Sequence, residues 1–124
     1  MSAVPVFEVA SALARIDGDA GMYGYFLTVF RDKNAGCVCK IRAALRRGDT
    51  AGARVLAHSL KGGSATVGAV RLAAAAARLE KSLEESVADD RLLAIVEDEW
   101  QRAMRSLVAL LESPLQWSLA VFER

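Results

Sequence analysis

The chain has 124 residues, of which 53% are hydrophobic and 25% charged, and its formal net charge is +1. This length and composition are typical of one domain with its own core. The small net charge argues against a nucleic-acid binder that relies on a basic surface. One histidine and two cysteines are too few for two sets of zinc ligands, and they leave no additional histidine or cysteine for a Ser/His/Asp or Cys/His catalytic site. We therefore expect no metal site.

The sequence carries no signal for membrane insertion or secretion. No uncharged apolar run approaches the roughly 18 residues of a membrane span. The N-terminus carries Glu8 and lacks the basic start of a secretory signal. Cys37 and Cys39 would point to nearly opposite sides of a helix, which disfavours a mutual bridge or joint ligation. We expect free thiols in a reducing cytoplasm.

The first half of the chain has a helical period. A short first helix is expected over Val6–Ile16, where apolar residues recur every three or four positions. A turn follows at Asp17–Asp19, with Asp19 as the expected N-cap of the next segment. The period then continues to Arg47. This segment is either one long helix or two helices with a break near residues 34–36.

Turn residues divide the second half into three further helices. Gly48 is a natural stop, and Asp49 or Thr50 is a natural cap for a helix that extends to about Val67. After Gly68, helical segments are expected at residues 69–86 and from residue 89 or 90 onward, each with one apolar stripe.

The two prolines, Pro5 and Pro114, lie near the two ends, so the residues between them contain no helix breaker. We expect an all-α fold: an antiparallel four-helix bundle core over about residues 19–112, with an extra short N-terminal helix and a short C-terminal tail. One domain covers residues 1–124. The tail contains Trp117 and Phe122, and we expect it to pack against the bundle.

The charges are unevenly distributed along the chain. Between Arg31 and Lys61 there are eight basic and two acidic residues, whereas between Glu80 and Glu99 there are eight acidic and two basic residues. Either neighbouring helices pair these charges, or the basic segment forms a docking face.

The single histidine, His58, lies outside the predicted packing stripe of its helix. That stripe follows a spacing of three and four residues and consists of Ala53, Leu56, Leu60, Gly63 and Val67. With about 100° of rotation per residue, His58 lies roughly 200° from Leu56 and points away from the core. The residues around it are small or cationic: Arg54, Val55, Lys61, Gly62 and Ala65.

Two consecutive glycines follow the histidine, and each costs roughly 1 kcal/mol relative to alanine inside a helix. Gly63 falls on the packing stripe, where it permits close approach of another helix. Gly62 falls on the exposed face, where packing does not explain it. Its missing side chain leaves space for a phosphoryl group on the imidazole and for a partner surface, and Lys61 can reach the phosphoryl oxygens.

Residues 58–68, His-Ser-Leu-Lys-Gly-Gly-Ser-Ala-Thr-Val-Gly, resemble the signature of histidine-containing phosphotransfer (Hpt) domains of multistep two-component phosphorelays. Weaker similarity extends through residues 17–30, the Gly48-Asp49 turn and Leu79-Glu80, and thus over most of the chain. The resemblance implies a four-helix bundle with the histidine exposed midway along one helix. It also implies that His58 accepts a phosphoryl group from a receiver-domain aspartyl phosphate and passes it to a response-regulator aspartate.

The resemblance also suggests how the site residues divide the work. His58 attacks as a neutral ring, the usual state of a histidine of ordinary acidity near neutrality. Lys61 favours that form and stabilises the transferred group, and Gly62 provides clearance. No ATP site is visible, and we expect a phosphoryl carrier rather than an enzyme. We expect no cofactor, because the partner receiver supplies the magnesium.

One position departs from the family pattern. Many Hpt domains have a glutamine twenty-two residues after the histidine, and here that residue is Glu80. An acceptor at this place would hold the proton on Nδ1 and leave Nε2 as the nucleophile. We expect Glu80 to orient the ring, and the alternative is a solvated glutamate.

The expected partners are receiver domains of a hybrid sensor kinase or a response regulator, with no nucleic acid and no membrane insertion of this domain. We expect a cytoplasmic monomer, either free-standing or as the C-terminal cytoplasmic domain of a membrane-bound sensor kinase. The expected docking residues are Arg54, Val55, Ser59 and Ala65, together with Lys61 and Gly62. Two alternatives remain: a module that docks receivers without phosphotransfer, and a structural bundle whose signature is coincidental.

Overall fold

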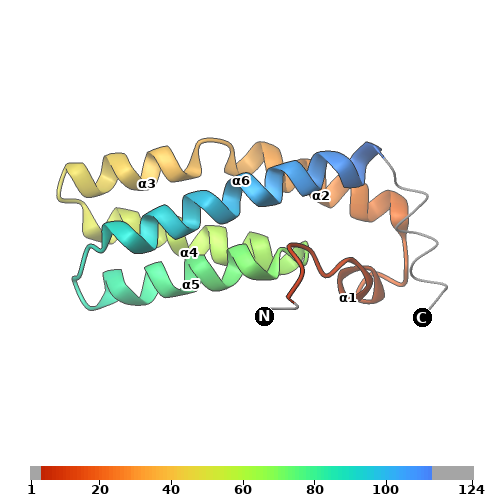
Figure 1. Cartoon of the computed structure of the whole chain (residues 1–124), viewed down its shortest axis with the longest axis horizontal. Helices are drawn as coiled ribbons and strands as arrows, with labels where there is room; N and C mark the ends of the chain where they lie inside the picture. Colours follow the sequence, from red (N-terminus) through yellow and green to blue (C-terminus); the bar gives the residue numbers. More distant parts are fainter. Residues whose placement is uncertain (1–3, 113–124) are drawn as a thin grey trace.

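The computed structural model describes residues 4–112, and this range contains six α-helices. In chain order they are α1 (Val9–Ala14), α2 (Ala20–Asn34), α3 (Cys37–Arg46), α4 (Thr50–Thr66), α5 (Val70–Glu84) and α6 (Asp90–Glu112). Helices α2 and α3 follow one another along one edge, α4 and α5 lie side by side, and α6 runs back along the bundle (Figure 1). The α2–α3 pair, α4, α5 and α6 form an antiparallel four-helix bundle, which confirms the expected all-α fold.

Aspartate side chains cap three of the helices, as the sequence predicts. Asp19 Oδ1 accepts a hydrogen bond from the Met22 amide at 2.9 Å, and Asp49 Oδ1 accepts one from the Gly52 amide at 2.8 Å. Asp89 accepts from the backbone amide of the second residue of α6. Such caps satisfy amides that have no partner inside the helix. They fix where α2, α4 and α6 begin.

The segment between residues 19 and 47 forms two helices with a break at Ala35 and Gly36. Ala35 has an extended ψ of 129°, and Gly36 has a φ of 75°, a left-handed conformation that glycine adopts without strain. The buried Asn34 directs its Nδ2 group to the Phe30 carbonyl at 2.9 Å. The spacing of apolar residues is the same on both sides of the break, so it could not distinguish one long helix from two. The backbone of Ala35 and Gly36 shows that there are two helices.

The first helix is shorter than the expected Val6–Ile16, because a tertiary contact precedes its start and a local turn follows its end. The Glu8 amide donates to the Gly68 carbonyl at 2.8 Å, which ties the preceding residues to the turn between α4 and α5. At the other end, the Gly18 amide donates to the Leu13 carbonyl, and Gly18 has a φ of 73°. Only Val9–Ala14 remain helical.

Apolar residues from every helix meet in one core. Helices α4 and α5 pack closely and contribute small residues to the core. Ala53 and Ala57 of α4 and Ala76 of α5 are fully buried. Their size lets these two helices approach closely. The expected C-terminal tail, including Pro114, Trp117 and Phe122, lies outside the described residues. Across residues 4–112, no helix has the length and apolar character needed to cross a membrane.

Candidate functional site

His58 lies midway along α4, on the face turned away from the core. The buried residues of this helix are Ala53, Ala57, Leu60 and Ser64, whereas the His58 side chain is 66% exposed. Helical phase therefore gave the correct direction for the imidazole. The core face is rotated slightly from the expected stripe, since Leu56 and Gly63 are only half-buried and the small residues Ala57 and Ser64 are buried instead.

The C-terminal half of α4, which follows His58, is held by residues from the start of the chain. Tyr23 donates its hydroxyl proton to the Val67 carbonyl at 2.7 Å. Arg15 donates to the carbonyls of Ala65 and Thr66 at 3.0 and 3.1 Å. Cations are favourable at a helix C-terminus, where carbonyl groups lack helical partners. These contacts fix the turns of α4 that follow His58.

Glu80 lies in the interface between α4 and α5 and contacts two residues of α4 at once. The residue is buried, with a relative exposure of 9%. Its Oε2 atom lies 2.7 Å from His58 Nδ1, and its Oε1 atom lies 2.7 Å from Lys61 Nζ. Histidine and lysine are three residues apart, so one carboxylate from the facing helix reaches both. Glu80 is thus not the solvated glutamate of the alternative interpretation.

The pKa of the Glu80 carboxyl lies below its ordinary value. The hydrogen bond from Lys61 has the largest effect, the contact with His58 acts in the same direction, and burial opposes both. An ionised carboxylate can only accept hydrogen bonds. In a neutral imidazole, this short contact requires the proton to be on Nδ1, and the lone pair is then on Nε2.

The two glycines beside the site have different surroundings. A Cβ atom on Gly62 would meet nothing within 4 Å, so the surface one turn beyond His58 is open. A Cβ atom on Gly63 would lie 3.4 Å from the Phe30 ring and 3.6 Å from Asn34 Nδ2. Gly63 thus sits at the close contact between α2 and α4, whereas no contact within the described residues explains Gly62.

The expected docking residues surround the histidine on the exposed face of α4. Arg54, Val55, Ser59 and Ala65 are all exposed, with Val55 at 62%, and Lys61 is partly exposed. Arg54 forms no ion pair with any of residues 4–112. The surface around His58 therefore combines the Arg54 cation with small and apolar groups.

The uneven charges of the sequence are partly paired between helices. Lys61 and Glu80 join the basic segment to the acidic one. Arg42 and Glu97 do the same across α3 and α6, at 3.3 Å. These pairs confirm the pairing interpretation in part, whereas the docking face stays a prediction for Arg54, which has no such partner among residues 4–112.

An apolar surface on α2 adds a feature that the sequence analysis did not predict. Met22, Tyr25 and Val29 are exposed, with Tyr25 at 66%. A hollow of about 380 Å³ lies between α1, α2 and α4, and its lining includes Ala12 of α1, Phe26 of α2 and Ala65 of α4. The sequence does contain a signal for this surface, because these apolar residues lie outside the stripe of Tyr23, Leu27 and Phe30 that faces the core.

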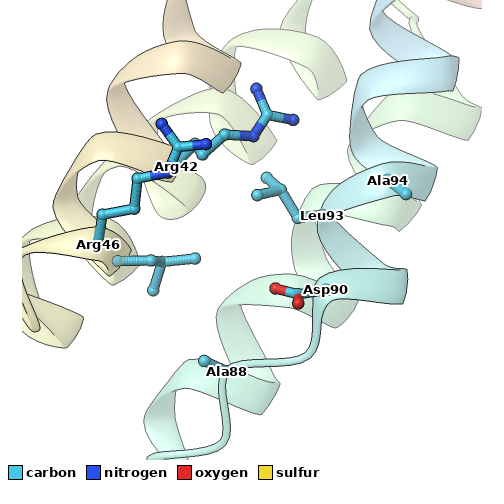
Figure 2. Close-up of a pocket in the computed structure, with 7 residues that line it drawn as sticks. Arg42, Arg46, Ala88, Asp90, Leu93 and Ala94 are labelled. Atoms are coloured by element: carbon cyan, nitrogen blue, oxygen red, sulfur yellow. The ribbon is translucent and has the colours of Figure 1, made fainter.

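A separate pocket of about 480 Å³ lies between α3 and the start of α6 (Figure 2). Its lining consists of Arg42, Leu45, Arg46, Ala88, Asp90, Leu93 and Ala94. The Asp90 carboxylate shares this pocket with the two arginines, and Arg42 also pairs with Glu97. The pocket contains no residue of the His58 site.

No cluster of three or more histidine, cysteine, aspartate or glutamate residues that could hold a metal ion occurs between residues 4 and 112. The candidate site thus consists of an imidazole, a lysine, a glutamate and an open helix surface. Comparison with protein families gives a match between residues 26–113 and the model of the Hpt domain. Comparisons with curated proteins and with solved structures gave no match.

Proposed function

Because this chain belongs to the Hpt domain family, whose members serve histidine phosphotransfer in two-component phosphorelays as phosphocarriers, we propose that His58 accepts a phosphoryl group from a receiver-domain aspartyl phosphate and passes it to a response-regulator aspartate. The observation that carries the proposal is the exposed imidazole whose Nδ1 atom lies 2.7 Å from a buried carboxylate. Because the contact occupies Nδ1, Nε2 is the ring atom that acts as the nucleophile in this proposal.

In the proposed step, the lone pair of Nε2 attacks phosphorus and the bond from phosphorus to the donor carboxylate oxygen breaks. The electron pair of that bond leaves on the aspartate. Glu80 orients the ring and holds the proton on Nδ1, so no proton has to move during attack. The reverse step, on a second receiver, returns the lone pair to Nε2.

Lys61 and Gly62 have supporting roles in this proposal. The Lys61 ammonium is three residues from His58 and 37% exposed, which leaves part of it accessible to the oxygens of a group on Nε2. Its positive charge stabilises the dianionic phosphoryl group. Gly62 supplies the clearance, because its surroundings are open to a partner.

We further propose that the receiver docks on the exposed face of α4, over Arg54, Val55, Ser59 and Ala65. Phe26 of α2, which shares a hollow with Ala65, extends this face. The magnesium that neutralises the transferring group would come from the receiver, and the exposed Arg54 cation would favour an acidic receiver surface. The domain has no cofactor of its own in this account.

The proposed setting is the cytoplasm, with the domain acting as a monomer. Cys37 is buried and Cys39 exposed, and both are free thiols. Burial raises the pKa of the Cys37 thiol to about 11, which keeps it protonated and unreactive. A reducing compartment preserves the exposed Cys39 thiol as well.

The test is incubation of the full chain with a phosphorylated receiver domain, with His58→Gln as the matched control. A label that is acid-labile and alkali-stable, and that appears only on the wild type, supports the carrier. Binding of the receiver without label indicates a docking module instead. Absence of both label and binding leaves only a structural bundle.

A further inference from the structure

Glu80 contacts the imidazole through Nδ1, so this contact does not require Nε2 to be free of a substituent. The carboxylate is buried between α4 and α5, and each of its oxygen atoms has one partner, His58 or Lys61. Because a carboxylate has no hydrogen to donate, it cannot adapt to an unprotonated Nδ1 as an amide can by turning its NH₂ group toward the ring. The same contact is therefore available before and after a phosphoryl group occupies Nε2.

The charge of the ring changes when the phosphoryl group is attached. After attack, both nitrogens carry a substituent, phosphorus on Nε2 and hydrogen on Nδ1, and the ring is a cation. When the nitrogen–phosphorus bond breaks toward water or an aspartate, its electron pair returns to Nε2. The leaving group is neutral imidazole if Nδ1 has kept its proton. It is the imidazolate anion, a much poorer leaving group, if that proton has been lost.

A carboxylate 2.7 Å from Nδ1 favours the cationic ring, and its burial strengthens the attraction. Lys61 shares the carboxylate and weakens this effect without cancelling it, because each partner has its own oxygen atom. The other charged groups on these three helices form no ion pair with Glu80; they are Arg54 on α4, Arg71, Arg78, Lys81 and Glu84 on α5, and Arg31, Asp32 and Lys33 on α2.

We propose that Glu80 keeps Nδ1 protonated in the phosphorylated protein and thereby sets how long the phosphoryl group is stored. The inference rests on the proposed function, because it concerns the lifetime of the group on the same histidine. The site is built for rapid release: at neutral and mildly alkaline pH the phosphorylated ring remains the reactive cation, whereas a neutral amide at residue 80 would let it lose its proton.

The experiment loads the full chain with phosphoramidate, a small phosphoryl donor that needs no receiver. Phosphorus NMR then follows phosphorylated His58 between pH 6 and 9, beside free Nε2-phosphohistidine. We expect the protein-bound ring to lose its Nδ1 proton at least one pH unit above the free compound. Titration of both rings at the same pH contradicts the inference, and this comparison needs only the wild type.

Glu80→Gln supplies the second arm, with Glu84→Gln as the matched control one turn further along α5. At pH 8 we expect hydrolysis of the phosphorylated Glu80→Gln protein to be at least threefold slower than that of the wild type and of Glu84→Gln. Equal lifetimes contradict the inference while leaving the carrier function intact. Failure of the wild type to take a phosphoryl group on His58 contradicts both.

Discussion

Glu80 is the residue on which the geometry of the site depends. It lies on a different helix from His58 and Lys61, yet its two oxygen atoms contact both at 2.7 Å. Through these contacts a single buried carboxylate orients the ring and positions the ammonium. The contacts among these three residues make the site more than an exposed histidine.

Gly62 tests whether the open surface beside the imidazole is needed for docking. We expect Gly62→Gln to make the fold about 0.5 kcal/mol more stable, because glutamine is the better helix former and a Cβ atom at this position meets nothing within 4 Å. We also expect transfer from a phosphorylated receiver to slow by about tenfold or more, because the reacting atoms can no longer approach. Denaturation and rapid-quench phosphotransfer measure the two effects.

Ala43→Gln is the matched control for this prediction, since Ala43 is exposed on α3. It should leave transfer unchanged. Retained transfer in Gly62→Gln would show that the clearance has no role.

Lys61 tests whether a positive charge beside the ring stabilises the transferring group. We expect Lys61→Met to slow transfer by roughly ten- to a hundredfold, because the developing charge on the phosphoryl oxygens loses a cation. Lys81→Met removes a lysine from the exposed side of α5 and should have no effect. Equal rates for the two variants in single-turnover transfer would exclude this role of Lys61.

At the scale of elements, the turn between α4 and α5 joins the site helix to the start of the chain. Gly68 has a φ of 81°, and its carbonyl accepts the Glu8 amide. A Cβ atom there would lie 2.9 Å from the Glu8 carbonyl oxygen and 3.2 Å from the Ala12 side chain. No residue other than glycine fits this turn without a shift of α1.

Gly68→Ala should therefore destabilise the fold by about 3 kcal/mol, from backbone strain together with the clash against Glu8. Gly48→Ala is the matched control, because Gly48 also has a left-handed φ of 75° but open surroundings. Its cost should be about 1 kcal/mol, from strain alone. Urea denaturation of both variants separates the two contributions. Equal decreases in the free energy of unfolding would show that the close contact of Gly68 with Glu8 and Ala12 does not contribute to stability.

The starts of α2, α4 and α6 could be predicted from the sequence, because they depend on local capping by Asp19, Asp49 and Asp89. The start of α1 could not, because Glu8 and Gly68 lie sixty residues apart and meet only in the folded chain. Ser64 was not predicted as a core residue, because the prediction followed apolar residues and Ser64 is polar although fully buried. Local chemistry was visible in the sequence, and contacts between helices were not.

The same distinction applies to the site. Helical phase alone places His58, Gly62 and Ala65 on the exposed face of their helix, where they are found. The double contact of Glu80 depends on the spacing and register of α4 against α5, which a periodic pattern does not contain. The apolar surface around Tyr25 was missed because a helical period identifies the core stripe of α2 but does not show that its other apolar residues stay uncovered.

At the scale of the whole molecule, Glu80 of the site also affects how the free energy of unfolding depends on pH in the acid range. The pKa of Glu80 is lower in the folded protein than its ordinary value of 4.5. Its contribution to stability is therefore fully present above about pH 4.5 and is lost as the pH falls through the folded value. Glu80→Gln should make the free energy of unfolding less dependent on pH below this value.

Urea denaturation of the wild type and of Glu80→Gln between pH 3 and 7 measures this difference. Parallel curves at all pH values would mean that the contacts with Lys61 and His58 do not favour the ionised carboxyl. Glu84→Gln is again the matched control, because Glu84 is an exposed glutamate on the same helix.

The most direct test of the central claim is to locate the phosphoryl group on the protein. After transfer from a phosphorylated receiver, mass spectrometry with electron-transfer dissociation identifies the phosphorylated residue. Nitrogen-15 NMR of labelled histidine identifies the ring nitrogen that carries the phosphoryl group. The account predicts a single phosphoryl group on Nε2 of His58 with a proton on Nδ1. A phosphoryl group on Nδ1, or on any other residue, would contradict it.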